Sequence, residues 1–153
     1  MSGYNIKFNG IDRLYDKYSW RLTKRAKLVW QSGQVLQGSY QAELEKTLAE
    51  HYKRKYAIAV GSATDGLYFA LKSLGLNSQS KIVCPAFGYI AMSGAIKRLG
   101  AKPIFVDVDQ NGNLGTLSVG LNPNAVLYAN LFGNLADYDS IKKFCDSRKI
   151  PLI

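Results

Sequence analysis

The sequence predicts an α/β protein with a mostly parallel sheet covered by helices. Two observations lead to this class. From residue 56 onward, short apolar runs alternate with amphipathic segments of helical period, which is typical of βαβ units. Turn residues separate these segments: Gly75 and Gly100 follow predicted helices, and Pro85 ends a predicted strand. No internal repeat and no low-complexity segment interrupts the pattern.

In the first 55 residues, the apolar residues recur only at helical spacing. Apolar residues are spaced as in a helix over 11–30. A second helix is predicted over 39–52, with Ser39 as its N-cap and a stripe formed by Leu44, Leu48 and Tyr52. We therefore expect an N-terminal helical segment over 1–55 and the first part of an α/β domain over 56–153.

The predicted elements after residue 55 are a strand 56–60 buried on both faces, a helix 64–74, a strand 82–84, a helix 89–99, strands 104–106 and 125–129, a helix 138–147 capped by Asp137, and a strand that begins at 151–153. The chain ends where a buried strand begins. We therefore expect this sequence to be part of a larger domain.

Composition narrows the classes of function. The net charge of +9 favours anionic partners, but no zinc-finger spacing or RNP-like motif accompanies it, so we do not expect nucleic-acid binding. No apolar run is long enough to span a membrane, and the N-terminus does not open a secretory signal. The expected location is cytoplasmic, with no membrane partner.

Cysteine and histidine usage argues against metal sites and hydrolytic triads. Cys84 and Cys145 lie far apart and form no CxxC pair, so we expect two buried thiols and no metal. His51 is the single histidine and lies late in a predicted helix. A Ser-His-Asp site would have to use it, which disfavours a hydrolase.

The stretch VGSATDGLYFAL, residues 60–71, joins a predicted strand to a predicted helix through small residues. Such a turn directs free backbone N–H groups and the positive end of the helix dipole at one point, which suits a phosphate. Gly61 and Gly66 have the spacing of a P-loop, but Leu67-Tyr68 stands where Lys-Ser/Thr is needed. From these residues alone, a phosphate site and a plain strand-to-helix turn both remain open.

Two further predicted strands are followed by segments that contain small, aromatic and amide residues. The segments are Pro85-Ala86-Phe87-Gly88-Tyr89 and Asn130-Leu131-Phe132-Gly133-Asn134. Ligands bind at the carboxyl ends of the strands in open α/β sheets. An aromatic side chain at 87 or 89 could cover a flat ring there, or could belong to the core.

Together these motifs resemble the sugar-nucleotide aminotransferases of the DegT/DnrJ/EryC1/StrS family, which are fold-type-I pyridoxal-phosphate (PLP) enzymes. The similar segments, in chain order, are Ser32-Gly33 with Gly38 and Leu44-Glu45 (SG…G…LE), 61–67 (SGTDAL), 85–89 (P-[AS]-F-T-[FWY]), 99–109 (LGAKPVFVDVD), 130–133 (HLYG), Ala136-Asp137 (AD) and 149–153 (GLPVI). The resemblance implies a three-layer PLP-transferase large domain that is incomplete at the C-terminus.

The resemblance also implies roles for individual residues. The turn at Ser62, Ala63 and Thr64 would bind the PLP phosphate through backbone N–H groups and the Thr64 hydroxyl, and Tyr89 would stack on the pyridine ring. Two further residues, Phe87 and Asn130, would face the substrate.

Three positions depart from the family pattern, and each has a structural cost. Ala63 replaces a glycine, which requires a negative φ. Gly66 replaces an alanine, at a cost of about 1 kcal/mol in a helix. Gly88 replaces a threonine and removes a hydroxyl beside the ring.

Two functional residues of the family fall beyond Ile153. One is the aspartate that holds the pyridine nitrogen protonated, and the other is the Schiff-base lysine. The resemblance therefore implies no catalytic residue among these 153, inactivity of this chain alone, and PLP binding that is weakened or absent.

The implied function is that of the N-terminal portion of an aminotransferase that moves an amino group from an amino-acid donor, glutamate, to a keto-sugar nucleotide. Two alternatives stay open: a non-catalytic half-domain completed by another chain, and a PLP-dependent sugar dehydratase of the same family. A homodimer is implied, in which the basic helix 21–27 could face a neighbour's substrate diphosphate. The isolated chain is expected to self-associate, because half a sheet exposes an unpaired edge.

Overall fold

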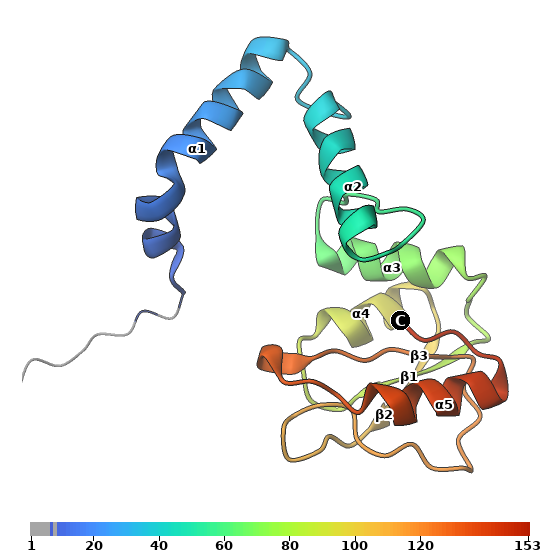
Figure 1. Cartoon of the computed structure of the whole chain (residues 1–153). Coiled ribbons are helices and arrows are strands. Elements are labelled where there is room, and N and C mark those ends of the chain that lie inside the picture. The colour runs from blue at the N-terminus through green and yellow to red at the C-terminus, as the bar shows by residue number, and fades with distance from the viewer. Residues whose placement is uncertain (1–6, 8) are drawn as a thin grey trace, which may run out of the picture. The chain divides into compact units, whose positions relative to one another are not determined.

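The computed structural model describes residue 7 and residues 9–153 (Figure 1). The chain forms two compact units that divide between Ala59 and Val60. The N-terminal unit is helical, and the C-terminal unit contains the sheet.

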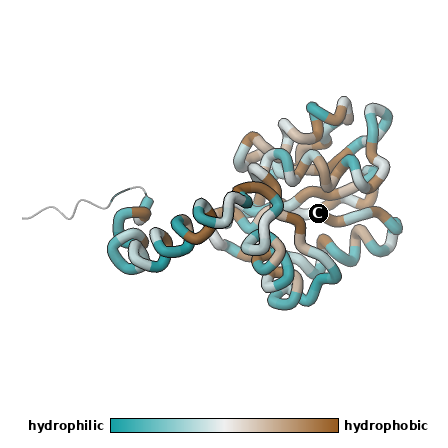
Figure 2. Tube along the Cα trace, turned by 90° about the horizontal axis from the view of Figure 1, so that it is seen from above, coloured by the Kyte–Doolittle hydropathy of each residue, from teal (hydrophilic) through white to brown (hydrophobic). Residues whose placement is uncertain are grey.

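The N-terminal unit consists of α1 (Ile11–Ser32) and α2 (Ser39–His51). Neither helix has a buried residue, although hydrophobic and hydrophilic residues alternate along them (Figure 2). The predicted cap of α2 was wrong by one position. Gly38 is the N-cap, because its backbone is extended and its carbonyl accepts from the N–H groups of Gln41 and Ala42, so Ser39 is the first helical residue.

The predicted strand 56–60 is the main correction. The segment has no strand hydrogen bonds, and Ile58 is 79% exposed. The N–H of Ala59 instead donates to Glu45 Oε1 of α2 at 2.9 Å. An apolar run predicts burial, but a strand also requires a neighbour, and none of the described residues pairs with this segment.

The sheet of the C-terminal unit is parallel throughout, as predicted. Its order is β2 (Lys102–Val106), β1 (Lys81–Pro85) and β3 (Ala125–Val126). A parallel bridge from Val126 to Leu152 extends it by one position, where the sequence predicts a strand to begin. β3 is shorter than predicted, although Leu127 and Tyr128 still donate to Val83 and Ile153.

Helices cover both faces of this sheet (Figure 1). Alternation along β1 directs Ile82 and Cys84 into one cluster and Val83 into another. The first cluster includes α3 (Ala63–Ser73) and α4 (Ala91–Arg98), and the second includes α5 (Tyr138–Arg148). The arrangement is three-layered, and the predicted α/β class is confirmed.

The residues predicted to cap or to follow the helices of the C-terminal unit have these positions in the structure. Asp137 caps α5, since its carboxylate accepts from the N–H of Ser140 at 3.2 Å. Gly75 and Gly100 follow α3 and α4 with φ of +74° and +80°, which glycine adopts at little cost. The carboxyl ends of β1 and β3 and the start of α3 now define where a ligand could bind.

Candidate functional site

The candidate site begins at the first turn of α3. Ser62 is the N-cap of this helix, and its hydroxyl is used within the turn. It accepts from the N–H of Asp65 at 3.1 Å and donates to the Asp65 carboxylate at 3.0 Å. The Ser62 side chain therefore shapes the helix start.

The backbone N–H groups of Ala63 and Thr64 are free donors. Among the described residues, neither has a hydrogen-bond acceptor, and the first intrahelical bond runs from Gly66 to Ser62. Ala63 is helical and is not among the positive-φ residues, so its Cβ is accommodated. Two free donors at the positive end of a helix can bind an anion.

The carboxylate in this turn is neutralised by an ion pair. Arg98 lies 2.5 Å from Asp65, and the guanidinium also stacks 4.2 Å from the centroid of the Tyr68 ring. The hydrogen bond from Arg98 lowers the pKa of Asp65 below its usual value. An anion at the start of α3 therefore does not meet an uncompensated negative charge.

An apolar cavity of about 180 Å³ lies beside the start of α3. Its walls come from α3, the end of β1, the start of α4 and the segments that follow β1, β2 and β3. The lining residues are Ala63, Leu67, Pro85, Phe87, Gly88, Tyr89, Ala91, Met92, Gly112, Ala129 and Leu131. Ala63 of α3 therefore shares one cavity with Phe87 and Tyr89 of the loop after β1, whereas Ser62, Thr64 and Asn130 do not line it.

The two aromatic residues after β1 are not core residues. Tyr89 is 74% exposed and Phe87 is 55% exposed, although both line the cavity. Gly88 between them has φ of +153°, a conformation that L-residues rarely adopt. Glycine is therefore suited to the backbone conformation between the Phe87 and Tyr89 rings.

Asparagine side chains hold the loops that complete the cavity. The Oδ1 of Asn130 accepts from the N–H of Ala136 at 3.0 Å, and the Oδ1 of Asn113 accepts from the N–H of Leu131 at 3.1 Å. Asn134 donates to the carbonyl of Asn111 at 3.2 Å. These bonds brace a turn in which Phe132 has a positive φ of 57° and is exposed.

Sequence reasoning missed Asn113 and Gly112. Asn113 is 1% exposed, and its Nδ2 has no partner among the described residues. Gly112 lies against Phe87 and Leu131, since a Cβ there would be 3.6 to 3.8 Å from their side chains. The run Asp109-Gln110-Asn111-Gly112-Asn113 signals a turn, but nothing in it indicates burial.

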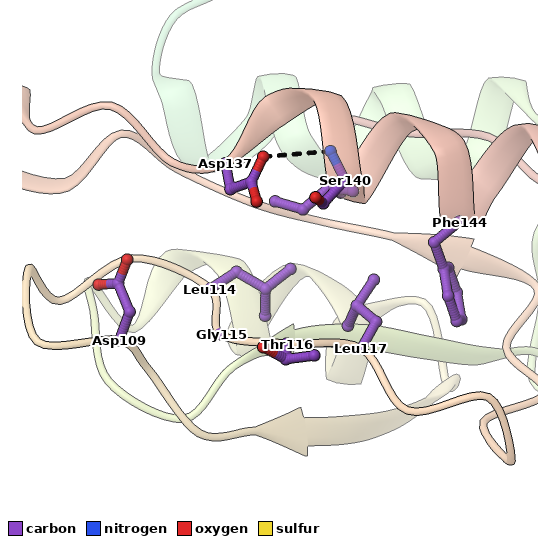
Figure 3. A pocket seen from close by; sticks show the side chains of 9 residues that line it. Asp109, Leu114, Gly115, Thr116, Leu117, Asp137, Ser140 and Phe144 are labelled. Atoms are coloured by element: carbon purple, nitrogen blue, oxygen red, sulfur yellow. Dashed lines mark hydrogen bonds between the residues drawn. The ribbon is translucent and has the colours of Figure 1, made fainter.

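A second cavity of about 320 Å³ lies between the loop 109–117 and α5 (Figure 3). The two carboxylates that line it already accept hydrogen bonds within the protein. Asp109 accepts from the N–H groups of Asn111 and Asn113, and Asp137 accepts from Ser140, as the dashed line shows. None of the predicted site residues lines this cavity.

The two cysteines are buried free thiols, as predicted. Burial raises the pKa of Cys84 to about 11 and also raises the pKa of Cys145. In the described part of the chain, no cluster of three metal-ligating side chains occurs. No described helix is both long and apolar enough to cross a membrane.

Fold and site together define an α/β domain that can take an anionic, flat ligand at the carboxyl edge of its sheet. The chain belongs to the DegT/DnrJ/EryC1/StrS aminotransferase family, whose sequence profile matches residues 19–153.

Named relatives and a solved structure agree with this assignment. The chain is 32% identical over 130 residues to a UDP-2-acetamido-2-deoxy-3-oxo-D-glucuronate aminotransferase of Pseudomonas aeruginosa, covering 82% of this chain and 36% of that protein. It is 31% identical over 131 residues to a UDP-4-amino-4-deoxy-L-arabinose–oxoglutarate aminotransferase of Shewanella sediminis, covering 82% and 34%. The structure of NtdA from Bacillus subtilis with bound cofactor PMP superposes with a TM-score of 0.90 at 25% identity, covering 99% of this chain and 36% of that one.

The chain thus spans about a third of the length of the curated relatives it matches. The recognised family and its fold are confirmed.

Proposed function

We propose that this chain is the N-terminal portion of a PLP-dependent aminotransferase that acts on a keto-sugar nucleotide. The single observation that carries the proposal is the cavity beside the start of α3, which Ala63, the first residue with a free N–H, and the exposed Tyr89 both line. Two relatives named for UDP-linked sugars support the substrate class, and one named for oxoglutarate supports glutamate as donor.

The start of α3 would bind the phosphate of PLP. The N–H groups of Ala63 and Thr64 would donate to it, and the exposed Thr64 hydroxyl can add a third donor. Because Arg98 neutralises Asp65, the helix dipole acts on the phosphate without a competing charge.

The cavity would hold the ring. Tyr89 offers an exposed aromatic face, and the remaining walls are apolar, which suits a flat heteroaromatic group. The residues present therefore fit PLP. Phe87 borders the same cavity, and the Asn130 amide nitrogen has no acceptor among the described residues, so both are proposed to face the substrate.

When bound, PLP supplies the electron sink that amino transfer requires. The residues of this chain bind and orient the cofactor; the groups that protonate the ring and form the Schiff base are proposed to lie in sequence that follows Ile153. We propose that the complete enzyme is a cytoplasmic homodimer and that this chain alone is inactive.

Residue-specific NMR tests the site even if binding is weak. Adding PLP at millimolar concentration to the ¹⁵N-labelled chain is expected to shift the amide signals of Ala63 and Thr64, and pyridoxal without phosphate is not. Tyr89→Ala is expected to weaken binding about tenfold, as loss of one aromatic stacking contact does in other sites. Tyr52→Ala, an exposed tyrosine of α2, is the matched control.

Two results would contradict the proposal. The first is an equal response to PLP and pyridoxal. The second is stoichiometric trapping of PLP on a single lysine by borohydride, which would show that this chain contains its own Schiff-base residue.

A further inference from the structure

Helix α4 contributes to both parts of the candidate site. Its start lines the cavity through Ala91 and Met92, shortly after the exposed Tyr89. Its last residue, Arg98, contacts Asp65 in the first turn of α3, which packs beside α4 (Figure 1). One short helix therefore connects the wall proposed for the ring with the turn proposed for the phosphate.

Both oxygens of the Asp65 carboxylate are bound within the protein. Oδ1 accepts from Nη1 of Arg98 at 2.5 Å, and Oδ2 accepts from the Ser62 hydroxyl at 3.0 Å. Asp65 is the third residue of α3. A carboxylate at this helical position can otherwise accept from backbone N–H groups at the helix start and would then compete with a bound anion.

Tyr68 fixes the position of the Arg98 guanidinium. The guanidinium lies 4.2 Å from the centroid of the Tyr68 ring, and the Lys72 ammonium donates to the Tyr68 hydroxyl at 3.3 Å. Tyr68 is partly buried and packs against the core cluster between α3, α4 and the sheet. A guanidinium stacked on an anchored ring is already ordered, so it loses less freedom when it pairs with a carboxylate.

The ion pair between Arg98 and Asp65 is too exposed to be explained by folding stability. The two side chains are 52% and 43% exposed, and ion pairs at such positions stabilise folded proteins only weakly. Its effect is local, because it lies one turn or less from the free N–H groups of Ala63 and Thr64.

We propose that Arg98 is a positioning residue for the cofactor phosphate and that it acts through Asp65. Arg98, held by Tyr68, keeps the Asp65 carboxylate away from the N–H groups at the start of α3, which stay available to the ligand. The nature of the ligand rests on the proposed function, whereas the role of Arg98 goes beyond it.

A double-mutant cycle in the whole 153-residue chain tests this role. The dissociation constant of PLP is measured from the amide shifts of Ala63 and Thr64. Arg98→Ala is expected to weaken PLP binding about two- to fivefold, the range that a charge at a helix N-terminus produces. The loss is expected to be smaller in an Asp65→Asn background, because an amide competes for the N–H groups less than a carboxylate does. An equal loss in both backgrounds would show that Arg98 acts on the phosphate directly and would overturn the proposal.

Lys97→Ala is the matched control. Lys97 and Arg98 are both cations of the last turn of α4, so removal of either costs the helix a similar interaction with its dipole. Among the ion pairs of the described residues, Asp65 contacts Arg98 and not Lys97. Lys97→Ala is therefore expected to leave PLP binding unchanged.

Two variants of Tyr68 test how Arg98 is held. Tyr68→Phe keeps the ring that stacks on Arg98 and is expected to retain PLP binding, whereas Tyr68→Leu removes the ring and is expected to weaken it. Circular dichroism verifies that each variant is folded. Equal PLP binding by the two folded variants would contradict the part assigned to Tyr68.

The ionisation of Asp65 tests the contact without a ligand. The hydrogen bond from Arg98 is the largest of the causes that lower the pKa of Asp65. Arg98→Ala and Tyr68→Leu are therefore expected to raise the pKa of Asp65 toward its usual value, and Lys97→Ala is not. Carboxyl ¹³C shifts recorded against pH measure the change, and an unchanged pKa in Arg98→Ala would overturn the proposal.

Failure here is distinguishable from failure of the proposed function. Absence of PLP shifts at Ala63 and Thr64 in the unaltered chain overturns the phosphate site and, with it, this role for Arg98. Retained shifts with equal PLP affinity in the unaltered chain and in Arg98→Ala, or equal losses in Arg98→Ala and Lys97→Ala, overturn only the role of Arg98.

Discussion

Asn113 is a buried polar residue that joins two loops beside the apolar cavity at the start of α3. Its Oδ1 accepts from the N–H of Leu131, while its Nδ2 is unpaired among the described residues. Because one bond is made and one buried donor is left without a partner, the side chain contributes rigidity at a cost in stability.

Replacement of Asn113 by leucine is expected to destabilise the chain. The variant leaves the N–H of Leu131 without an acceptor but also removes the unpaired Nδ2, so the net expected cost is that of the lost hydrogen bond, about 0.5–1.5 kcal/mol. Urea denaturation followed by circular dichroism measures the change. Asn111→Leu, at an exposed position of the same loop, is the control, and equal stability of both variants would contradict this role for Asn113.

The thiol of Cys84 should make stability depend on alkaline pH. Burial raises its folded pKa from 9.0 to about 11, so the protonated thiol is favoured in the folded state. This contribution is complete below pH 9 and is lost as the pH rises from 9 toward 11. Chemical denaturation across this range is expected to show falling stability in the native chain and a smaller decrease in Cys84→Ala.

At the scale of the elements, α3 combines a favourable cap with an unfavourable glycine. Ser62 satisfies one N–H at the helix start, whereas Gly66 lies within the first turns. A Cβ at position 66 would lie 3.2 Å from Cγ2 of Val60. This contact with Val60 is the steric cost that an alanine would meet at position 66.

Gly66→Ala is expected to stabilise the chain by a few tenths of a kcal/mol, up to about 1 kcal/mol. The gain in helix propensity exceeds the contact, because Val60 is exposed and can shift by the small distance required. Thermal unfolding measures the effect. Destabilisation by Gly66→Ala would contradict this prediction, and recovery of stability in the Gly66→Ala, Val60→Ala double variant would then identify the contact as the cause.

The cap of α5 should be sensitive to acid. Hydrogen bonds from the hydroxyl and N–H of Ser140 lower the pKa of Asp137, so the ionised carboxylate stabilises the folded state. This contribution is present above pH 3.8 and is lost as the pH falls through the lower folded pKa. Asp137→Ala is expected to lower the thermal midpoint at pH 7, while Asp137→Asn retains an acceptor and most of the midpoint but loses the acid dependence.

Most helices and strands were predicted correctly from the sequence. The prediction was wrong where a strand depends on pairing with another segment of the chain. The periods of α1, α3 and α5 and the apolar runs of β1 and β2 were sufficient, because local pattern determines them. The strand 56–60 was predicted wrongly, because apolar composition does not reveal which chain segment pairs with it.

The candidate site was predicted in part for a similar reason. The turns at Ala63 and Tyr89 were recognised from motifs, and the structure brings both to one cavity. Their ligand roles stay predictions. Asn113 and Gly112 were missed, because their contribution depends on contacts with Leu131 and Phe87, which are distant in the sequence.

At the scale of the whole molecule, the two units differ in how much they bury. Among the residues that the structure describes, the buried hydrophobic ones all lie after residue 70, whereas α1 and α2 bury none. Helix α1 therefore offers a surface for association. This surface is its apolar stripe, which recurs at helical spacing and consists of Ile11, Leu14, Tyr15, Tyr18, Leu22, Ala26 and Val29.

The isolated chain is expected to self-associate through this stripe. Sedimentation equilibrium should show a mass that rises with protein concentration. The double variant Leu14→Lys and Leu22→Lys, which charges two exposed positions of the stripe, is expected to reduce association, whereas Lys27→Ala on the other face is not. A monomer at high concentration would contradict the prediction.

The order of strands in the sheet also bears on how the C-terminal unit folds. Lys81 of β1 pairs with Lys102 of β2, and only α4 and its short connections separate them, whereas Ile82 pairs with Ala125 across a much longer segment. Closing the shorter segment costs less chain entropy. The β1–α4–β2 crossover is therefore the least costly first pairing, and it forms the edge onto which later strands can be added.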